Sequence, residues 1–337
     1  MLQRKVFVAS TARDLREWRK LVIEAVDGLD GYQPICMERF GSRDAVADDF
    51  CLEQVAQCDL FIGIIGHLYG NCPPDSSESY TYREYKEAKK RGKPRLMFVA
   101  DQDFPMPANL LDRLGEHKQQ QQQAFRKQVD EEVIRIKFKS PADLVTKVLQ
   151  AIHNWHQKSL TDRAERRANT LASLTRLYIL EANDLSGTFG TITEALAQTL
   201  DVERVSIWRY TKDRSAIRCH DLYILSRQQH DSSADLEVTS YPCYFRALET
   251  SEVLDAEDAR TDPRTREFLN DYLLKHGIVS MMDVPIHLSE RLGGVVCHEH
   301  TGQKRKWTSD EKTFAIAVAN IVSLAIERFV QRDSTNL

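Results

Sequence analysis

The carboxylate of Glu84 is the side chain whose position most suggests chemistry. It lies in the segment 79–94, which we predict to be a helix that follows an apolar run at 58–66. Such an unbroken run is typical of a parallel strand covered on both faces. Open α/β sheets bind ligands beyond the carboxyl ends of these strands, so the position suits a catalytic carboxylate. In the alternative interpretation Glu84 is a charge on the helix surface, where Glu87 can pair with Arg91.

Two histidines are candidate ligands for a metal or haem. His298 and His300 flank Glu299 on a predicted strand, so their rings would share one face. The alternative is that each ring is packed or hydrogen-bonded in place, since no third and fourth ligand is visible. The pair Cys219-His220 is too common a dipeptide to indicate a chromophore attachment. We therefore predict no metal and no cofactor.

The elements that would position Glu84 alternate between strands and helices. This alternation predicts a doubly wound α/β sheet, parallel throughout. A run of glutamines at 119–123 is interpreted as a solvated helix or loop. The predicted strands are 5–10, 33–37, 58–66, 95–100 and 133–138, and the predicted helices are 11–27, 44–57, the Glu84 helix and 141–156.

The second half of the chain has a different pattern. A helix at 159–180 carries apolar residues at steps of three and four, which favours a seam facing either a second copy or the same chain. Antiparallel strands with helices gathered around them then predict an α+β domain. The predicted strands are 204–210, 217–224, 280–288 and 292–300, and the predicted helices are 189–200, 241–250, 263–275 and 309–332.

The composition is that of an ordinary globular protein. With 337 residues, 42% hydrophobic and 28% charged, the chain has room for two cores, and its net charge of -4 gives no basic field for nucleic acid. Seven scattered cysteines without a C-x-x-C pair indicate reduced, mostly buried thiols. We see no signal sequence and no apolar run long enough to span a membrane, and we therefore expect a cytoplasmic protein.

The first 158 residues resemble an uncharacterised TIR-like family, the domain of unknown function 4062. The matching segments are Val6-Phe-Val-Ala-Ser-Thr-Ala-Arg-Asp-Leu15, Asp59-Leu-Phe-Ile-Gly-Ile-Ile-Gly66 with Tyr69-Gly70, and Thr81-Tyr-Arg-Glu-Tyr85 through Gly92-Lys-Pro94. The resemblance implies a flavodoxin-like or TIR-like arrangement of the sheet.

The Thr-x-x-Glu spacing around Glu84 is also similar to that around the catalytic glutamate of nucleoside deoxyribosyltransferases. TIR domains that cleave NAD place a glutamate on the corresponding helix. By this resemblance Glu84 is the catalytic residue, because an anion stabilises or traps a sugar with oxocarbenium character. Ser10, Thr11, Tyr69 and Thr81 are the expected substrate-binding residues. Ser10 and Thr11 are equally explained as the cap of the first helix.

The segment from about 187 to 330 resembles a GAF sensory domain. The residues that carry this resemblance are Arg204-Val-Ser-Ile-Trp-Arg-Tyr210, Asp262-Pro-Arg-Thr265, Gly277-Ile-Val-Ser-Met-Met-Asp-Val-Pro-Ile286 and Gly293-Gly-Val-Val-Cys-His-Glu-His300. GAF domains bind small molecules or tetrapyrroles, or serve as dimerisation modules. The signature of the branch that binds cyclic nucleotides is absent.

Together these observations predict a TIR-like domain at 1–158, a connecting helix at 159–182 and a GAF domain at 183–332. We expect a sensor in which the GAF domain receives a ligand and the first domain cleaves NAD or a related nucleotide, as in cellular defence. The alternative is a signalling adaptor whose two domains only bind partners. The expected partners are an unidentified GAF ligand and a second copy of the chain; we expect no nucleic acid and no membrane.

Overall fold

The computed structural model describes residues 3–11, 14–36, 47–101, 115–180, 184–289 and 291–335. By the contacts within it, the chain separates into two compact units, Met1–Ser159 and Leu160–Leu337. The predicted strand end at Met37 and the predicted helix start at residue 44 lie outside the described residues.

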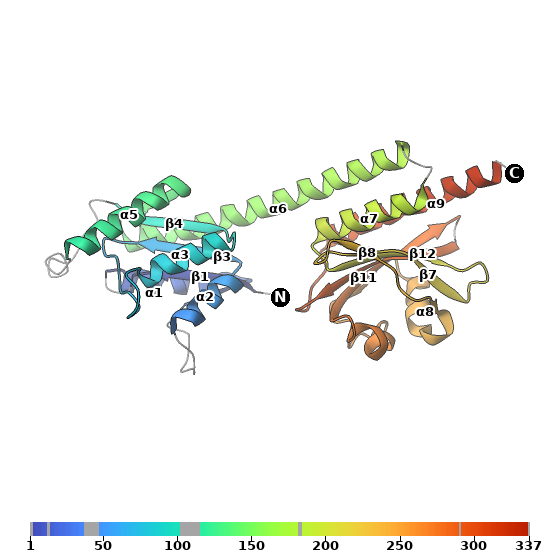
Figure 1. Ribbon diagram of the computed structural model, residues 1–337, viewed down its shortest axis with the longest axis horizontal. Coiled ribbons are helices and arrows are strands. Elements are labelled where there is room, and N and C mark those ends of the chain that lie inside the picture. The colour runs from blue at the N-terminus through green and yellow to red at the C-terminus, as the bar shows by residue number, and fades with distance from the viewer. Residues whose placement is uncertain are drawn as a thin grey trace. The chain divides into compact units, whose positions relative to one another are not determined.

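The first unit contains a five-stranded parallel sheet with the order β2-β1-β3-β4-β5 (Figure 1). The central strand β3 is buried along its whole length, which accounts for its unbroken apolar sequence. The strand order reverses between β1 and β3, and open α/β sheets bind ligands at such a switch point. The predicted doubly wound sheet is thus confirmed. The strands are β1 Arg4–Ser10, β2 Tyr32–Ile35, β3 Leu60–Ile65, β4 Arg95–Ala100 and β5 Arg135–Phe138.

Helices cover both faces of this sheet. On one face, α1 and α6 bury Val22 and Leu144 against strand residues such as Ile62. On the other face, α3 and α5 bury Tyr85 and Phe125, together with residues from α2. The glutamine run lies within α5, so the helical alternative holds, but Gln122 of the run is buried and not solvated. The helices are α1 Arg16–Asp27, α2 Ala47–Gln57, α3 Tyr80–Lys90, α5 Glu116–Glu132 and α6 Pro141–Leu180.

The helix α6 unites two predicted helices. The sequence indicated a closing helix at 141–156 and a connecting helix at 159–180, but the structure has one helix of 40 residues. Leu144 and Val148 of α6 belong to a core of the first unit, and Leu174 belongs to a core of the second.

The second unit is built on an antiparallel sheet with the order β10-β11-β12-β6-β7-β8, to which β9 is added beside β7. β6 pairs with β7 and β11 pairs with β12, both antiparallel. This sheet confirms the predicted α+β domain. The strands are β6 Arg204–Tyr210, β7 Ala216–Ile224, β8 Gln229–Asp231, β9 Leu236–Glu237, β10 Leu254–Ala256, β11 Ile278–Leu288 and β12 Arg291–Thr301.

The two faces of this sheet carry different covers (Figure 1). The helices α7 Leu185–Leu200 and α9 Ser309–Thr335 pack on one face, and α8 Pro242–Thr250 lies over the other. The short helices η3 Arg266–Phe268 and η4 Leu269–Leu273 pack beside α8, and η2 Val238–Ser240 precedes it.

The predicted α-helix at 263–275 is wrong, because η3 is a 3₁₀ turn and η4 a π turn. Side chains that bond to the backbone draw this segment away from an α-helix. The Thr265 hydroxyl donates to the carbonyl of Ala259, and Asp262 accepts from the backbone N–H of Arg264.

By length and composition alone, residues 309–332 of α9 would suffice to cross a membrane. Core helices of soluble proteins pass the same test, and α9 buries residues such as Phe314, Val318 and Ile326 against the sheet.

Candidate functional site

The helix α3 turns Glu84 toward the interior of the first unit. Ser79 caps the helix, accepting a hydrogen bond from the backbone N–H of Tyr82 at 3.2 Å. Thr81, Glu84 and Tyr85 share the buried side of α3, and Glu84 is only 5% exposed. The surface-charge interpretation of Glu84 is therefore wrong.

Glu87, the other glutamate of α3, lies near the surface of the helix. Glu87 forms the predicted surface pair with Arg91, with 2.7 Å between the carboxylate and Nε. The helix thus carries one glutamate that is paired at the surface and another that is buried.

Three segments that are distant in sequence meet beside the start of α3. Gly70, in the loop after β3, has a φ of +88°, and a Cβ placed on it would lie 3.1 Å from Cγ2 of Thr11 and 3.9 Å from Cβ of Ser79. Burial raises the pKa of Tyr69, and hydrogen bonding to Ser79 opposes this rise. Thr11, Tyr69 and the first turn of α3, which contains Thr81, are therefore neighbours at the carboxyl end of the sheet.

Ser10 has a different environment from Thr11. Its hydroxyl accepts a hydrogen bond from Arg19 of α1 at 3.3 Å, whereas the Thr11 hydroxyl donates to Asp14. Neither residue caps α1, which begins after Leu15 without a side-chain cap. The capping interpretation of Ser10 and Thr11 is therefore wrong.

Sequence reasoning missed the residues that hold the loop after β3. Asp14 accepts hydrogen bonds from the backbone N–H groups of His67 and Leu68 at 3.0 and 3.1 Å. From α5, Gln122 and Arg126 donate to the carbonyl of Gly66 at 2.7 and 3.0 Å. Asp14 comes soon after the predicted strand 5–10, so its position near the carboxyl edge of the sheet could have been predicted. Nothing in the glutamine run distinguishes Gln122 from its neighbours.

An open hollow of about 580 Å³ adjoins this end of the sheet. Its volume falls in the range of ligand sites. Glu84 is not among the residues that line it, so the hollow and the buried carboxylate are separate features. The lining residues are Asn71, Cys72, Pro74, Ser76, Ser77, Tyr80, His117, Lys118 and Gln121.

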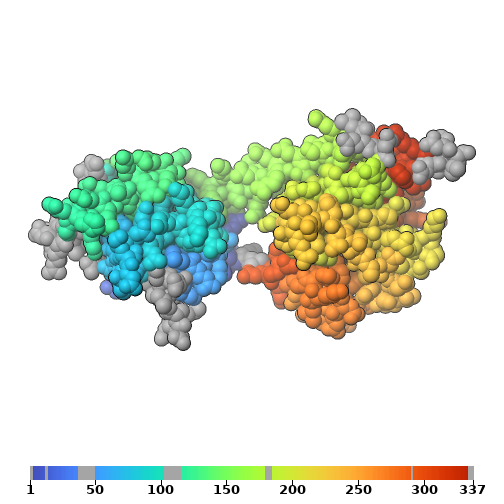
Figure 2. Space-filling model, in the orientation of Figure 1, coloured from blue at the N-terminus to red at the C-terminus, as the bar shows by residue number. Residues whose placement is uncertain are grey.

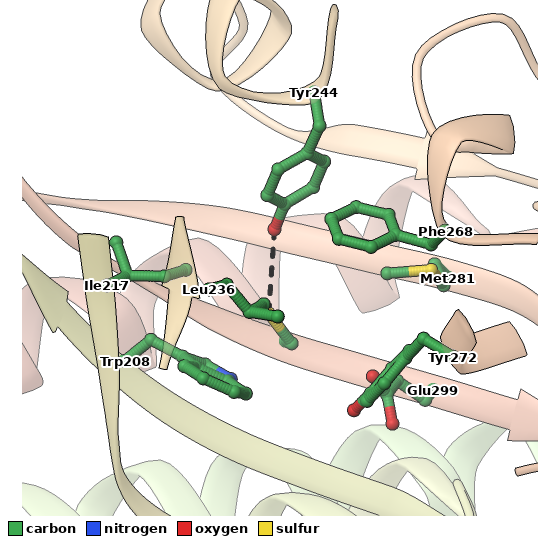
Figure 3. Close-up of a pocket in the computed structure, with 9 residues that line it drawn as sticks. Trp208, Ile217, Leu236, Tyr244, Phe268, Tyr272, Met281 and Glu299 are labelled. Atoms are coloured by element: carbon green, nitrogen blue, oxygen red, sulfur yellow. Dashed lines mark hydrogen bonds between the residues drawn. The ribbon is translucent and has the colours of Figure 1, made fainter. Parts of the chain in front are cut away.

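The second unit has a pocket between its sheet and the α8 side. Figure 3 shows Tyr244 extending from α8 toward the sheet, with Trp208 on one side and Tyr272 beside Glu299 on the other. Ile217, Leu236, Phe268, Met281 and Cys297 complete the lining. The walls are thus mostly apolar, with a small number of polar groups.

One polar group lies behind Tyr244. The Tyr244 hydroxyl donates to Oδ2 of Asp283 at 2.7 Å and lies 3.7 Å from the sulfur of Cys297. Asp283 is wholly buried, and within the described part of the chain its Oδ1 has no hydrogen-bond partner. Burial raises the pKa of this carboxyl to about 7.

A second polar group lies at the other side of the pocket. Arg204 donates to Glu299 at 2.8 Å, and both side chains are buried. The Tyr272 hydroxyl lies 3.5 Å from Arg204. Burial raises the pKa of Glu299 even though the guanidinium opposes the shift.

The pocket is narrow in this conformation. The space open to the centre of a water molecule is about 10 Å³, which is room for about one water. In the space-filling view the segments drawn in orange, which include η3 and η4, form part of the molecular surface on the face in view (Figure 2).

The histidine pair is separated from this pocket. His298 pairs with Met282 across the strands, and its Nδ1 lies 2.8 Å from the Met282 carbonyl, on the face of the sheet opposite Glu299. Burial lowers the pKa of His298 to about 4. Among the described residues no three histidine, cysteine or acidic side chains gather as metal ligands. His298 is therefore a hydrogen-bonded core residue, the second of the two interpretations.

All seven cysteines are free thiols. Cys36, Cys51, Cys58 and Cys297 are buried, Cys72 and Cys219 are half-buried, and Cys243 is exposed. Most of these thiols are thus buried, as expected, and their reduced state stays a prediction. Cys219-His220 lies on the strand β7.

Comparison with solved structures gives similarities that each cover about half of this chain. One is a phycocyanobilin-bound GAF domain from a cyanobacterial phytochrome (17% identity, TM-score 0.43, covering 49% of this chain and 96% of that chain). Another is the GAF domain of a phosphoenolpyruvate-protein phosphotransferase from Acinetobacter (14%, 0.40, 47% and 91%). A third is the GAF domain of such a phosphotransferase from Coxiella burnetii (16%, 0.42, 52% and 99%).

Comparison with known families assigns both parts of the chain. No curated protein matches it. Residues 5–153 match the domain of unknown function DUF4062, and residues 184–326 match the GAF domain. The chain therefore carries a DUF4062 domain followed by a GAF domain.

Proposed function

We propose that this chain is a cytoplasmic signalling protein whose GAF domain binds a small molecule and regulates the DUF4062 domain. The observation that carries the proposal is the mostly apolar pocket of the GAF domain. Behind its lining residue Tyr244, Asp283 keeps one carboxylate oxygen without a hydrogen-bond partner among the described residues. Ligand sites commonly combine apolar walls with a few polar groups of this kind. An unpaired buried carboxylate oxygen is costly, and a ligand that bonds to it would remove that cost.

Native mass spectrometry of the protein after incubation with a metabolite extract tests the sensing role. We expect a retained small molecule on the wild-type protein and on Met282→Trp, and none on Met281→Trp. Met281 lines the pocket, whereas its neighbour Met282 packs in the core on the other face, so the two variants are matched in bulk. A wild-type protein that retains nothing would exclude this role.

A second function is proposed for the DUF4062 domain, namely cleavage of the N-glycosidic bond of NAD or a related nucleotide. Its support is that Glu84 is buried on α3, whose first turn adjoins Thr11 and Tyr69 at the switch point of the sheet. A carboxylate in that position would stabilise or trap the sugar cation left by the departing base. The resemblance to TIR domains that cleave NAD also favours this reaction.

Chromatographic measurement of nicotinamide release from NAD tests this second function. We expect Glu84→Gln to lower the rate by roughly a hundredfold or more, as is typical when a group that stabilises transition-state charge is removed. Glu87→Gln, which changes the surface glutamate of the same helix, should leave the rate unchanged. If the wild-type protein releases no nicotinamide, or if Glu84→Gln is as active as wild type, the domain is better described as a binding module of a signalling adaptor.

A further inference from the structure

The acidic groups at the GAF pocket outnumber the basic ones. Asp283 pairs with Cys297 and Met281 pairs with Glu299 across β11 and β12, so both carboxyls lie on the same face of the sheet. Arg204 on the next strand bonds Glu299. Asp283 accepts a hydrogen bond from the Tyr244 hydroxyl and interacts with the Cys297 thiol and the backbone of His298, none of which is a cation. When both acids are ionised, one negative charge is therefore unbalanced.

Aromatic rings surround these acids. Trp208, Tyr244, Phe268 and Tyr272 all line the pocket. The indole N–H of Trp208 is already used, since it donates to Ser206 at 2.8 Å. Ring faces attract cations, and the attraction is stronger where water is excluded. The rings and the unbalanced carboxyl would both favour a positively charged ligand.

Resting on the sensing role, we propose that this pocket takes a small organic cation, an amine or amidine whose N–H groups bond Asp283 and Glu299 beside the rings of Trp208 and Tyr272. Its N–H groups would satisfy the Asp283 oxygen that has no partner. Its charge would balance the second acid. A neutral or anionic ligand of the same shape would leave that acid uncompensated.

The cover of the pocket must move to admit such a ligand, because the space now holds only about one water. Phe268 and Tyr272 lie on η3 and η4, which are short turns rather than a full helix. π-turns are frequent at functional sites. An outward shift of η4 would break the 3.5 Å contact of Tyr272 with Arg204 and its hydrogen bond with Glu299. The N–H groups of the ligand would replace the bond to Glu299.

Calorimetric titration of the full chain with benzamidine, benzamide and benzoate tests the proposal. These probes share one shape and differ in charge. We expect benzamidine to bind at least tenfold more tightly than either of the others and to raise the Tm. Asp283→Asn should weaken benzamidine binding by roughly ten- to a hundredfold, the usual effect of losing a charged hydrogen bond. The matched control is Asp221→Asn, which removes an acid bonded to Thr193 and His230 of the same unit, away from the pocket lining.

The proposal is overturned if benzamide binds as tightly as benzamidine, if Asp283→Asn leaves benzamidine affinity unchanged, or if none of the probes binds. The comparison of the three probes needs no variant and therefore holds even where Asp283→Asn fails to fold. A neutral metabolite retained in the mass-spectrometric experiment would exclude the cationic class while leaving the sensing role intact. Absence of any retained metabolite would exclude the sensing role itself.

Discussion

The raised pKa of the Asp283 carboxyl makes the free energy of unfolding of the GAF domain depend on pH. This pKa rises from the ordinary value of 3.8 to about 7 because burial disfavours the charged form, and Glu299 adds to the rise. An acid whose pKa is higher in the folded state contributes stability at low pH. That contribution is complete below about pH 4 and is lost as the pH rises through about 7.

We therefore predict that wild type loses stability relative to Asp283→Asn as the pH is raised from 4 to 8. The loss should be on the order of 4 kcal/mol, since each pKa unit corresponds to about 1.4 kcal/mol. Urea unfolding of both proteins across this range measures the difference, and other acids cancel in the comparison. A difference that does not vary with pH would show that Asp283 is ionised equally in the folded and unfolded states.

At the scale of single residues, the sequence predicted which residues of the DUF4062 domain lie close together better than it predicted the acids at the GAF pocket. Thr11, Tyr69 and Thr81 follow from strand ends, because consecutive parallel strands deliver their carboxyl ends to one edge. The sheet neighbours Asp283 and Glu299 depend instead on the register of two antiparallel strands. A shift of one residue would place either acid on the other face, and the sequence alone does not fix that register.

At the scale of elements, the loop between β3 and α3 is held by close packing around Gly70. Gly70 has a positive φ, and an added Cβ would lie 3.1 Å from Thr11. Gly92, after α3, has a φ of +62° but no neighbour within 4 Å of an added Cβ. Substitution of Gly92 by alanine should therefore carry only the cost of the backbone conformation, and substitution of Gly70 should carry the additional cost of crowding.

We predict that Gly70→Ala destabilises the DUF4062 domain by about 2–3 kcal/mol and Gly92→Ala by about 1 kcal/mol. The additional cost at Gly70 would come from moving Thr11 or the loop. Urea unfolding of the two variants provides the measurement. Equal costs would contradict the packing of Thr11 against Gly70.

The sequence predicted most long helices and strands, because the spacing of their apolar residues fits only one of these two structures. It missed short elements whose conformation depends on bonds to other segments or whose length is too small to show a pattern. The 3₁₀ and π turns at 266–273 follow from bonds such as that of Thr265 with Ala259, which the helical spacing does not reveal. The short strands β8 and β10, of three residues each, contain too little pattern to be recognised.

At the scale of the whole molecule, we propose a homodimer formed through α9. Leu324 is 47% exposed and Val330 is 50% exposed on this helix, whereas apolar residues such as Phe314, Val318 and Ile326 are buried. Contact with a second copy along α9 would remove both apolar side chains from water.

Light scattering at micromolar concentration should therefore show a dimer for wild type and a monomer for Leu324→Glu with Val330→Glu. Leu21→Glu is the control, because Leu21 is 42% exposed but lies on α1 of the DUF4062 domain. A wild-type protein that scatters as a monomer would exclude the proposed contact.

The helix α6 also limits how this chain can be divided. Because Leu144 and Val148 complete one hydrophobic core and Leu174 another, cleavage before residue 144 would strip the amino-terminal fragment of side chains that shield its sheet. Cleavage after residue 174 would do the same to the carboxyl-terminal fragment. Only a break in the middle of the helix, near Ser159, leaves each fragment with its own share. Recombination that exchanged either half for a foreign partner would therefore have to join the two sequences within a helix rather than in a loop.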